Sequence, residues 1–242
     1  QHGATWAQPV SRLRVQTSTL PQGAVNLNVD GRRVASPLLG FGQLWRKTYS
    51  VHLSGASVTP AEVIRTWKKN FARFWPKGSY FYGAQEGIGA GDVALLDLTL
   101  LGPLRLRTGT MVIFSGPTSF TFITPEGHQY AGLITFSAYD DTGTTVLQVQ
   151  PLIRASDPIY EMSLRLGIGH RIEDAFWRQS LRNLAAHFGV QGEVEQRTTI
   201  LDPAVQWSRQ EHLVQCRHTH DIAYTGGAIT LAATPSRPVT AA

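Results

Sequence analysis

The feature that most constrains this sequence is a succession of short β-type runs between Gly78 and Arg154, each separated from the next by turn-forming residues. Breaks such as Gly102-Pro103 and Asp140-Asp141-Thr142-Gly143 are typical of tight connections between antiparallel strands. The pattern therefore predicts an antiparallel meander of five hairpin-linked strands. The runs are Val93 to Leu101, Leu104 to Phe114, Ser119 to Thr124, Tyr130 to Tyr139 and Thr144 to Arg154.

A strand and a helix precede the meander. Thr59 and Pro60 form a capping position and a first-turn proline, and apolar residues then recur at helical spacing until Pro76. We expect a helix of about four turns in this segment. Before it, apolar and polar residues alternate from Leu44 to Leu53, which predicts a strand. Its mainly apolar face consists of Trp45, Lys47, Tyr49, Val51 and Leu53.

A long amphipathic segment follows the meander. Ser156-Asp157-Pro158 has the capping residue and the proline of a helix start, and Gly189 suits its end, so the sequence predicts one helix of about thirty residues. Its apolar stripe must be buried, and the only partner of sufficient size is the sheet. The stripe consists of Ile159, Met162, Leu166, Phe176, Trp177, Leu181, Leu184 and Phe188.

Composition narrows the class of protein. The chain has 242 residues, 42% of them hydrophobic, and no apolar stretch approaches the roughly 20 residues of a membrane-spanning helix. Its single cysteine, Cys216, can form no internal disulfide, which fits a reducing cytoplasm. The formal charge is +5, but the basic residues are scattered and the modules that read bases are absent, so no nucleic-acid partner is expected.

The order strand, helix, meander and final helix, from Leu44 to Gly189, resembles the helix-grip fold of the START and Bet v 1 type, in the SRPBCC superfamily that also contains polyketide cyclases. The Thr-Pro-Ala-Glu-Val start of the first helix and the Phe-Trp-Arg-Gln-Ser-Leu-Arg-Asn-Leu segment of the last one are similar to packing patterns of that superfamily. The resemblance implies an α+β fold in which a curved antiparallel sheet wraps around the C-terminal helix. It also implies a deep cavity that binds lipids, polyketides or aromatic metabolites.

The domain organisation is expected to follow the same resemblance. The helix-grip domain would occupy residues 43–192, with extensions at 1–42 and 193–224 and a flexible tail at 225–242 that does not pack. Either extension could cover the cavity or form a homodimer contact.

Three functions remain open for this fold. The first is binding of an apolar small molecule, and the second is a polyketide cyclase-like or dehydratase-like enzyme that uses polar residues of the cavity. The third is a non-enzymatic interaction module whose cavity is filled by its own side chains. Nucleophile, phosphate-binding and metalloprotease motifs are absent from the sequence, and no cofactor is expected. The glycines between Gly83 and Gly91 lack a βαβ unit and predict a flexible loop at the cavity mouth.

Polar residues that interrupt the stripe of the final helix are the first candidates for chemistry. His170 and Glu173 fall between Leu166 and Trp177 on nearly the same side of that helix. A histidine beside a carboxylate can act as a general base, so this pair forms the candidate catalytic site, with Leu166 and Trp177 as ligand-binding neighbours. The alternative is that both polar residues lie at the edge of the stripe, in water or paired with an arginine.

Strand residues supply the other ligand-binding candidates. Arg105 and Arg107 share one face of their strand, and an arginine in the cavity would bind a ligand carboxylate. Two further sets alternate onto a common face and could orient a ligand hydroxyl, although a single-sided sheet also presents polar residues to water. They are Thr135, Ser137 and Tyr139, and Gln148 and Gln150.

Two smaller clusters have simpler interpretations. Glu126 and His128 lie in a turn that offers a carboxylate and an imidazole, although turn geometry alone explains its proline and glycine. Cys216, His218 and His220 have a metal-like composition, but ligands on alternate strand residues are too close for a tetrahedral site. We expect an ordinary strand there and no metal.

Overall fold

The computed structural model describes residues 34–83, 88–101, 104–125, 128–206, 221–225 and 228–232. Within them, strands form an 11-stranded sheet whose central order is β5-β6-β7-β8-β2-β9. The central strands are β2 (Leu44–His52), β5 (Leu104–Ser115), β6 (Ser119–Pro125), β7 (Tyr130–Asp141), β8 (Thr144–Ala155) and β9 (Glu195–Asp202). The predicted α+β class is confirmed.

The five-stranded meander is also confirmed. Strand β4 (Val93–Leu101) pairs with β5, and each later strand pairs antiparallel with the next, through β8. Strand β2 then pairs with β8, which brings the first predicted strand beside the last one of the meander. The short β3 (Tyr80–Tyr82), which pairs with β4, was not predicted, because three residues are too few to show an alternation.

The first helix is shorter than expected. Thr59 and Glu62 form a capping box at the start of α1 (Pro60–Lys69), in which each side chain bonds the backbone N–H of the other. At Asn70 the backbone leaves the α-helical region, and the chain continues as the 3₁₀ helix η5 (Phe71–Phe74). The predicted single helix is therefore two consecutive pieces, both with their apolar side chains buried against the sheet.

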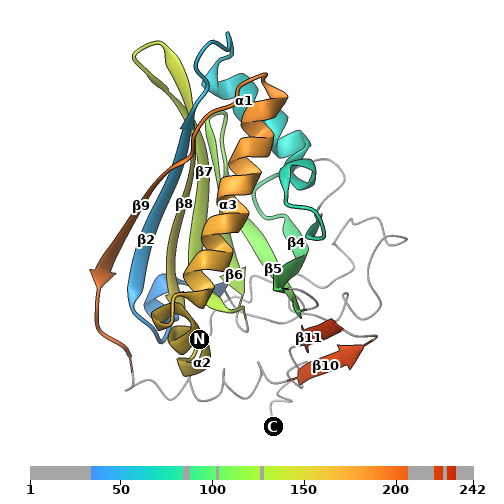
Figure 1. Ribbon diagram of the computed structural model, residues 1–242, viewed down its shortest axis with the longest axis vertical. Coiled ribbons are helices and arrows are strands. Elements are labelled where there is room, and N and C mark those ends of the chain that lie inside the picture. The colour runs from blue at the N-terminus through green and yellow to red at the C-terminus, as the bar shows by residue number, and fades with distance from the viewer. Residues whose placement is uncertain are drawn as a thin grey trace.

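The final helix is divided as well. Asp157 caps α2 (Pro158–Arg165) by accepting from the backbone N–H groups of Ile159 and Tyr160, and α3 (Ile168–His187) begins after Gly167. Gly167 has a φ of 75°, a conformation that glycine adopts without strain and that interrupts an α-helix. Figure 1 shows α3 lying across one face of the sheet, with α2 at its N-terminal end. The prediction of one unbroken helix was wrong at this point.

The core lies between α1, the sheet and the C-terminal half of α3. Trp67 of α1 makes edge-to-face contacts with Phe120 and Phe136 of the sheet, at ring-centroid distances of 5.8 and 5.3 Å. Leu181 and Leu184 of α3 are fully buried in the same cluster. Truncation of one such aromatic side chain to alanine typically destabilises a protein by about 3–5 kcal/mol. This end of the molecule is therefore solidly packed.

Strands from outside the predicted domain complete the sheet. β1 (Val34–Ala35) pairs with β6, and β9 covers the free edge of β2. A hairpin of β10 (Asp221–Thr225) and β11 (Ala228–Ala232) lies at the other side, where β11 runs parallel to β5 at Thr230 and Leu231. Part of the stretch beyond Thr225 therefore pairs with the sheet, contrary to expectation, because the edge of β5 offers unpaired backbone groups there.

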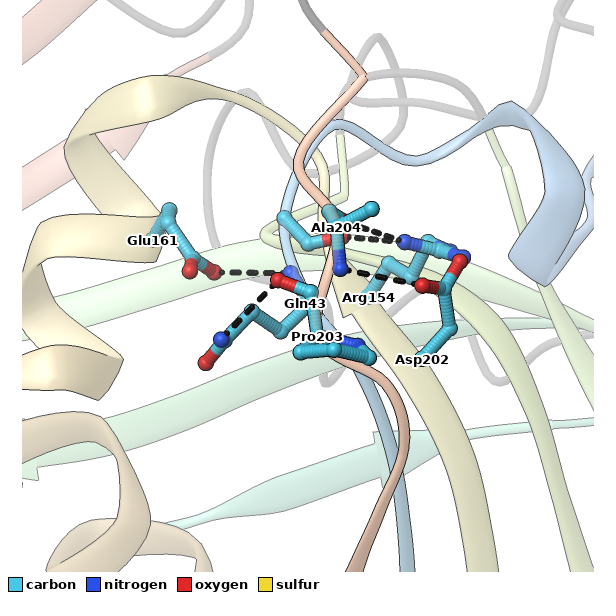
Figure 2. Close-up of polar contacts among 7 residues, drawn as sticks. Gln43, Arg154, Glu161, Asp202, Pro203 and Ala204 are labelled. Atoms are coloured by element: carbon cyan, nitrogen blue, oxygen red, sulfur yellow. Dashed lines mark hydrogen bonds and ion pairs between the residues drawn. The ribbon is translucent and has the colours of Figure 1, made fainter.

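A buried arginine ties several of these segments together. Arg154, 2% exposed, donates from Nη1 to the carbonyl oxygens of Gly42 (2.6 Å) and Ala204 (2.9 Å), and from Nη2 to Asp202. Figure 2 shows the neighbouring contact, in which Glu161 of α2 accepts from the backbone N–H of Gln43. The network fixes the end of β9 and the position of α2 relative to the sheet.

Candidate functional site

A cavity of about 320 Å³ lies between the sheet and the N-terminal half of α3. Ligand pockets in proteins are typically about 300–1,000 Å³ and mostly apolar, so this volume falls at the lower end of that range. The apolar lining comes from η5, four meander strands, α2 and α3. It includes Phe71, Trp75, Leu96, Leu98, Phe122, Ile134, Ile153, Ile172, Phe176 and Trp177.

The two halves of α3 face different surroundings, which explains where the cavity lies. Toward its C-terminus, Leu181 and Leu184 meet the aromatic core and are fully buried. Toward its N-terminus, the residues facing the sheet include Gly169 and Ile172, which line the cavity instead of filling it. The third function considered above, a module whose cavity is filled by its own side chains, does not agree with this space.

Several polar residues of the lining lie near the junction of α2 and α3. A Cβ built on Gly169 would lie 3.3 Å from the hydroxyl oxygen of Tyr130 and 3.4 Å from Oγ of Ser163. The His128 ring lies 6.2 Å from the ring of Tyr130, and the Tyr130 backbone N–H donates to Nδ1 of His128 at 3.0 Å. Burial lowers the pKa of His128 from its ordinary value of 6.5 to about 4, which keeps this imidazole neutral near pH 7.

A buried ion-pair cluster adjoins these polar residues. Lys47 of β2 is fully buried, and its Nζ lies 2.8 Å from Oε2 of Glu173 and 2.8 Å from Oδ1 of Asp174. The hydroxyl of Tyr49 also donates to Oδ1 of Asp174, at 2.6 Å. These contacts satisfy the ammonium group, which could not otherwise be buried without a large desolvation cost.

The pKa values of the two carboxyl groups of this cluster are shifted in opposite directions. Burial raises the pKa of Glu173, and the nearby Lys47 opposes only part of that effect. Burial alone would also raise the pKa of Asp174, but the hydrogen bonds from Lys47 and Tyr49 help to outweigh it and lower this pKa. Glu173, which lines the cavity, is thus the acid whose proton affinity is increased.

The predicted catalytic pair is not brought together as expected. Glu173 lines the cavity, whereas His170 lies beside it and packs edge-on against Trp45, with ring centroids 4.5 Å apart. Both ring nitrogens of His170 are buried without a hydrogen-bond partner. Burial, together with the charge of Lys47, lowers the pKa of His170 to about 4. A catalytic role for either residue stays a prediction.

The two predicted helical neighbours also separate. Trp177 lines the cavity and packs against Phe136 at 5.4 Å between ring centroids. Leu166 lies at the break between α2 and α3, is 65% exposed, and is not among the lining residues. An unbroken helix would have directed it inward, so its misplacement follows from the break at Gly167.

Five predicted strand residues lie on the face of the sheet opposite α3. The register pairs Tyr49 with Val149 and Val149 with Phe136, and these three side chains point into the core. Their immediate neighbours must point the other way, because successive residues of a strand alternate between faces. This places Thr135, Ser137, Tyr139, Gln148 and Gln150 outside the cavity, where Gln150 Nε2 donates to Oγ1 of Thr48 at 3.1 Å. The expectation that they line it is corrected accordingly.

Other candidates lie beyond what the structure describes. The backbone of Arg105 and Arg107 belongs to β5, paired with Thr99 and Asp97, but their side chains are outside the described part. Glu126 and the cluster of Cys216, His218 and His220 also lie outside the described residues, as do residues 84–87 of the glycine-rich loop. Within the described ranges there is no group of three or more His, Cys, Asp or Glu side chains arranged to hold a metal ion.

Sequence patterns did not identify three residues of the site as functional, namely Lys47, Tyr130 and Asp174. Lys47 carried a usable signal, because a lone lysine on the inward face of an alternating strand requires an acidic partner. Tyr130 and Asp174 carried none, since a tyrosine at a strand start and an aspartate on a helix are equally common at the surface. Their roles emerge only when β2, β7 and α3 come together.

Strand order, the helix across the sheet and the cavity between them define a helix-grip protein with an internal cavity. No protein-family model matches the sequence, and neither does any curated protein. Within the described residues, the helices lack the combined length and apolar character needed to cross a membrane.

Several solved structures are similar to part of this chain. The di-domain ARO/CYC StfQ from the steffimycin biosynthetic pathway is 12% identical, with a TM-score of 0.48 over 61% of this chain and 53% of that one. The match thus spans about half the length of StfQ. The KanY protein (ms6282) is 15% identical, with a TM-score of 0.44 over 62% of this chain and 99% of that one.

Protein Ms6760 from Mycobacterium smegmatis is similar to the same degree. It is 11% identical, with a TM-score of 0.43 over 59% of this chain and 89% of that one. At these identities and TM-scores the likenesses carry no argument about the site, which is interpreted from its own side chains.

Proposed function

We propose that this protein binds an apolar or aromatic small molecule in the cavity between the sheet and α3. The observation that carries the proposal is a space of about 320 Å³ lined mainly by aromatic and aliphatic side chains, with several polar side chains among them. Unfilled apolar space reduces stability by about 24 cal/mol per Å³. A domain that retains so much of it forgoes several kcal/mol of packing, which a bound ligand would restore.

The entrance is inferred to lie beside the α2–α3 junction. Ile159 and Ile168 line the cavity, yet they are 49% and 44% exposed, so they reach both the interior and the surface. Met162 and Leu166 are also largely exposed on the same segment. A ligand that enters here would pass over an apolar surface before it reaches the interior.

A cavity-filling substitution tests this proposal. We expect Ile172→Trp to occupy the space and to weaken binding of 2-methylnaphthalene, measured by isothermal titration calorimetry, by more than about tenfold. The matched control is Ile200→Trp, which makes the same change on β9, where Ile200 is 43% exposed and outside the lining. Equal effects of the two substitutions, or no binding to the unmodified protein, would contradict a ligand site in the cavity.

An enzymatic function of the cyclase or dehydratase kind is the second candidate. The observation that favours it is the position of Glu173 in the lining, with a pKa raised by burial, because a carboxylate of increased basicity can remove a proton next to a carbonyl group. We expect the protein to accelerate deuterium incorporation into 2-tetralone, followed by NMR, and Glu173→Gln to abolish the acceleration. No acceleration by the unmodified protein would eliminate this reaction class.

A further inference from the structure

Two polar groups near the junction of α2 and α3, on Tyr130 and His128, have no hydrogen-bond partner among the described residues that would fully occupy them. Tyr130 lines the space, its hydroxyl oxygen lies 3.3 Å from the Cβ position of the lining residue Gly169, and no protein partner is found for this hydroxyl group among the described residues. His128 uses Nδ1 for the Tyr130 backbone, which leaves Nε2 for another partner. Buried polar groups in proteins are normally hydrogen-bonded, so unpaired ones that line a cavity indicate where a polar group of a ligand would lie.

An acceptor lies near the same hydroxyl group. Glu173 follows Gly169 by one helical turn on the same side of α3, and Gly169 is the residue whose Cβ position lies 3.3 Å from the Tyr130 hydroxyl. The Glu173 side chain is 9% exposed, and it is a lining residue. Glu173 and Tyr130 therefore present an acceptor and a hydroxyl group to one small volume.

The cation beside this volume is already neutralised. Lys47 Nζ contacts both Glu173 and Asp174 at 2.8 Å, so one positive charge faces two carboxylates. When both acids are ionised the cluster carries a net charge of −1, from one Lys and two acids. A ligand carboxylate brought next to it would lose its hydration and meet a like charge, both of which weaken binding.

We infer that the cavity selects ligands with a neutral hydroxyl head group, such as a phenol or an alcohol, and rejects carboxylates of the same shape. The hydroxyl hydrogen of the ligand donates to Glu173, and its oxygen accepts from the Tyr130 hydroxyl. The ring system occupies the apolar remainder between Ile134, Ile172 and Phe176. This inference rests on the proposed binding function and adds the chemical class of the ligand.

Two matched pairs of probes test the inference without any substitution. The first pair, 2-naphthol and 2-methylnaphthalene, differs by a hydroxyl for a methyl group, and we expect 2-naphthol to bind about tenfold more tightly. The second pair, 2-naphthamide and 2-naphthoate at neutral pH, compares a neutral group with an anion of similar shape, and we expect naphthoate to bind at least about tenfold more weakly.

Substitutions then locate the selectivity. Tyr130→Phe should remove most of the advantage of 2-naphthol over 2-methylnaphthalene, while Tyr139→Phe, which makes the same change on the outer face, should leave it unchanged. Glu173→Gln should reduce the discrimination against naphthoate, because it removes one negative charge. Thermal melting of each variant confirms that it is folded.

The outcomes separate this inference from the binding function. If 2-methylnaphthalene binds but the members of each pair bind equally, or naphthoate binds best, the inference is overturned while the cavity remains a binding site. If none of the four probes binds, both are overturned. The inference stands only if both selectivities are observed and Tyr130→Phe diminishes the first.

Discussion

Lys47 is a charged side chain in a fully buried position, which is unusual for a lysine. Its aliphatic stem lies on the inner face of β2, and its ammonium group is in contact with two acids. A buried ion pair contributes little net stability compared with apolar packing, but loss of one partner leaves an uncompensated charge. The cluster is therefore sensitive to single substitutions.

We expect Lys47→Met to lower the free energy of unfolding by about 3 kcal/mol, because it leaves Glu173 charged and buried without its cation. Urea unfolding measures the change. Addition of Glu173→Gln to this variant should recover part of the loss, since the uncompensated charge is then removed. The control Lys69→Met, at an exposed position of α1, should change the unfolding free energy by less than about 0.5 kcal/mol. Equal losses at the two lysines would contradict the account of the cluster.

His128 gives the protein a predictable pH dependence. Its pKa is about 4 in the folded protein and 6.5 in the unfolded chain, so below pH 6.5 the unfolded state binds a proton that the folded state does not. Stability from this residue is fully present above pH 6.5 and decreases as the pH falls toward 4, by about 3 kcal/mol in total.

The difference between the protein and its His128→Asn variant isolates this effect, because asparagine can still accept from the Tyr130 backbone. We expect the unfolding free energy of the variant to fall less steeply between pH 6.5 and pH 4. His170 adds a smaller contribution of the same sign in both proteins, since it is partly exposed. Parallel curves for the two proteins would show that His128 is not held neutral by burial.

At the scale of elements, two glycines near the start of α3 have different structural roles. Gly167 interrupts the helix with a φ of 75°, and a Cβ there would meet no atom within 4 Å. Gly169 lies within the helix, where a Cβ would approach Cδ2 of Leu164 to 2.9 Å and the Tyr130 hydroxyl to 3.3 Å. The first glycine sets the backbone conformation, and the second allows α3 to approach the Tyr130 hydroxyl.

We expect Gly167→Ala to lower the free energy of unfolding by about 1 kcal/mol through backbone strain, with binding of 2-naphthol unchanged. Gly169→Ala should weaken binding of 2-naphthol, because its Cβ displaces the Tyr130 hydroxyl or Leu164. Calorimetric titration and thermal melting of both variants distinguish the two effects. Weaker binding in Gly167→Ala alone would show that the break, and not the close approach, shapes the site.

Sequence patterns predicted the elements much better than the faces they present. Turn residues and alternation located all five meander strands, because these signals are local. Alternation cannot say which of its two faces meets the helix when both contain polar residues, which is why Thr135 and Gln148 were assigned to the cavity. The break at Gly167 was missed because one glycine is tolerated within an amphipathic helix at a cost of about 1 kcal/mol.

The candidate site was predictable only in part. Glu173 and Trp177 were found from the helical stripe, since their spacing places them on the side that faces the sheet. Lys47 and Tyr130 come from strands far away in the sequence, and their meeting with α3 depends on the curvature of the sheet and the register of β2 against β8. Neither quantity is encoded in a local pattern.

At the scale of the whole molecule, α3 divides the interior into a packed end and an open end. The packed end contains the aromatic core around Trp67 and Phe136, and it supplies the stability that allows the other end to remain unfilled. At the open end, the network around Arg154 and Glu161 fixes α2 and β9 without placing side chains in the cavity (Figure 2). Stability and the proposed ligand binding thus depend on different halves of the same helix.

Intermolecular NOEs between the ring protons of 2-methylnaphthalene and the methyl groups of the protein test the central claim most directly. If the ligand occupies the cavity, the NOEs connect it to the methyl groups of Ile134, Ile153 and Ile172, which come from β7, β8 and α3. If the NOEs instead connect it only to the exposed methyl groups of Ile113 or Ile200, the open end of the molecule is not a binding site.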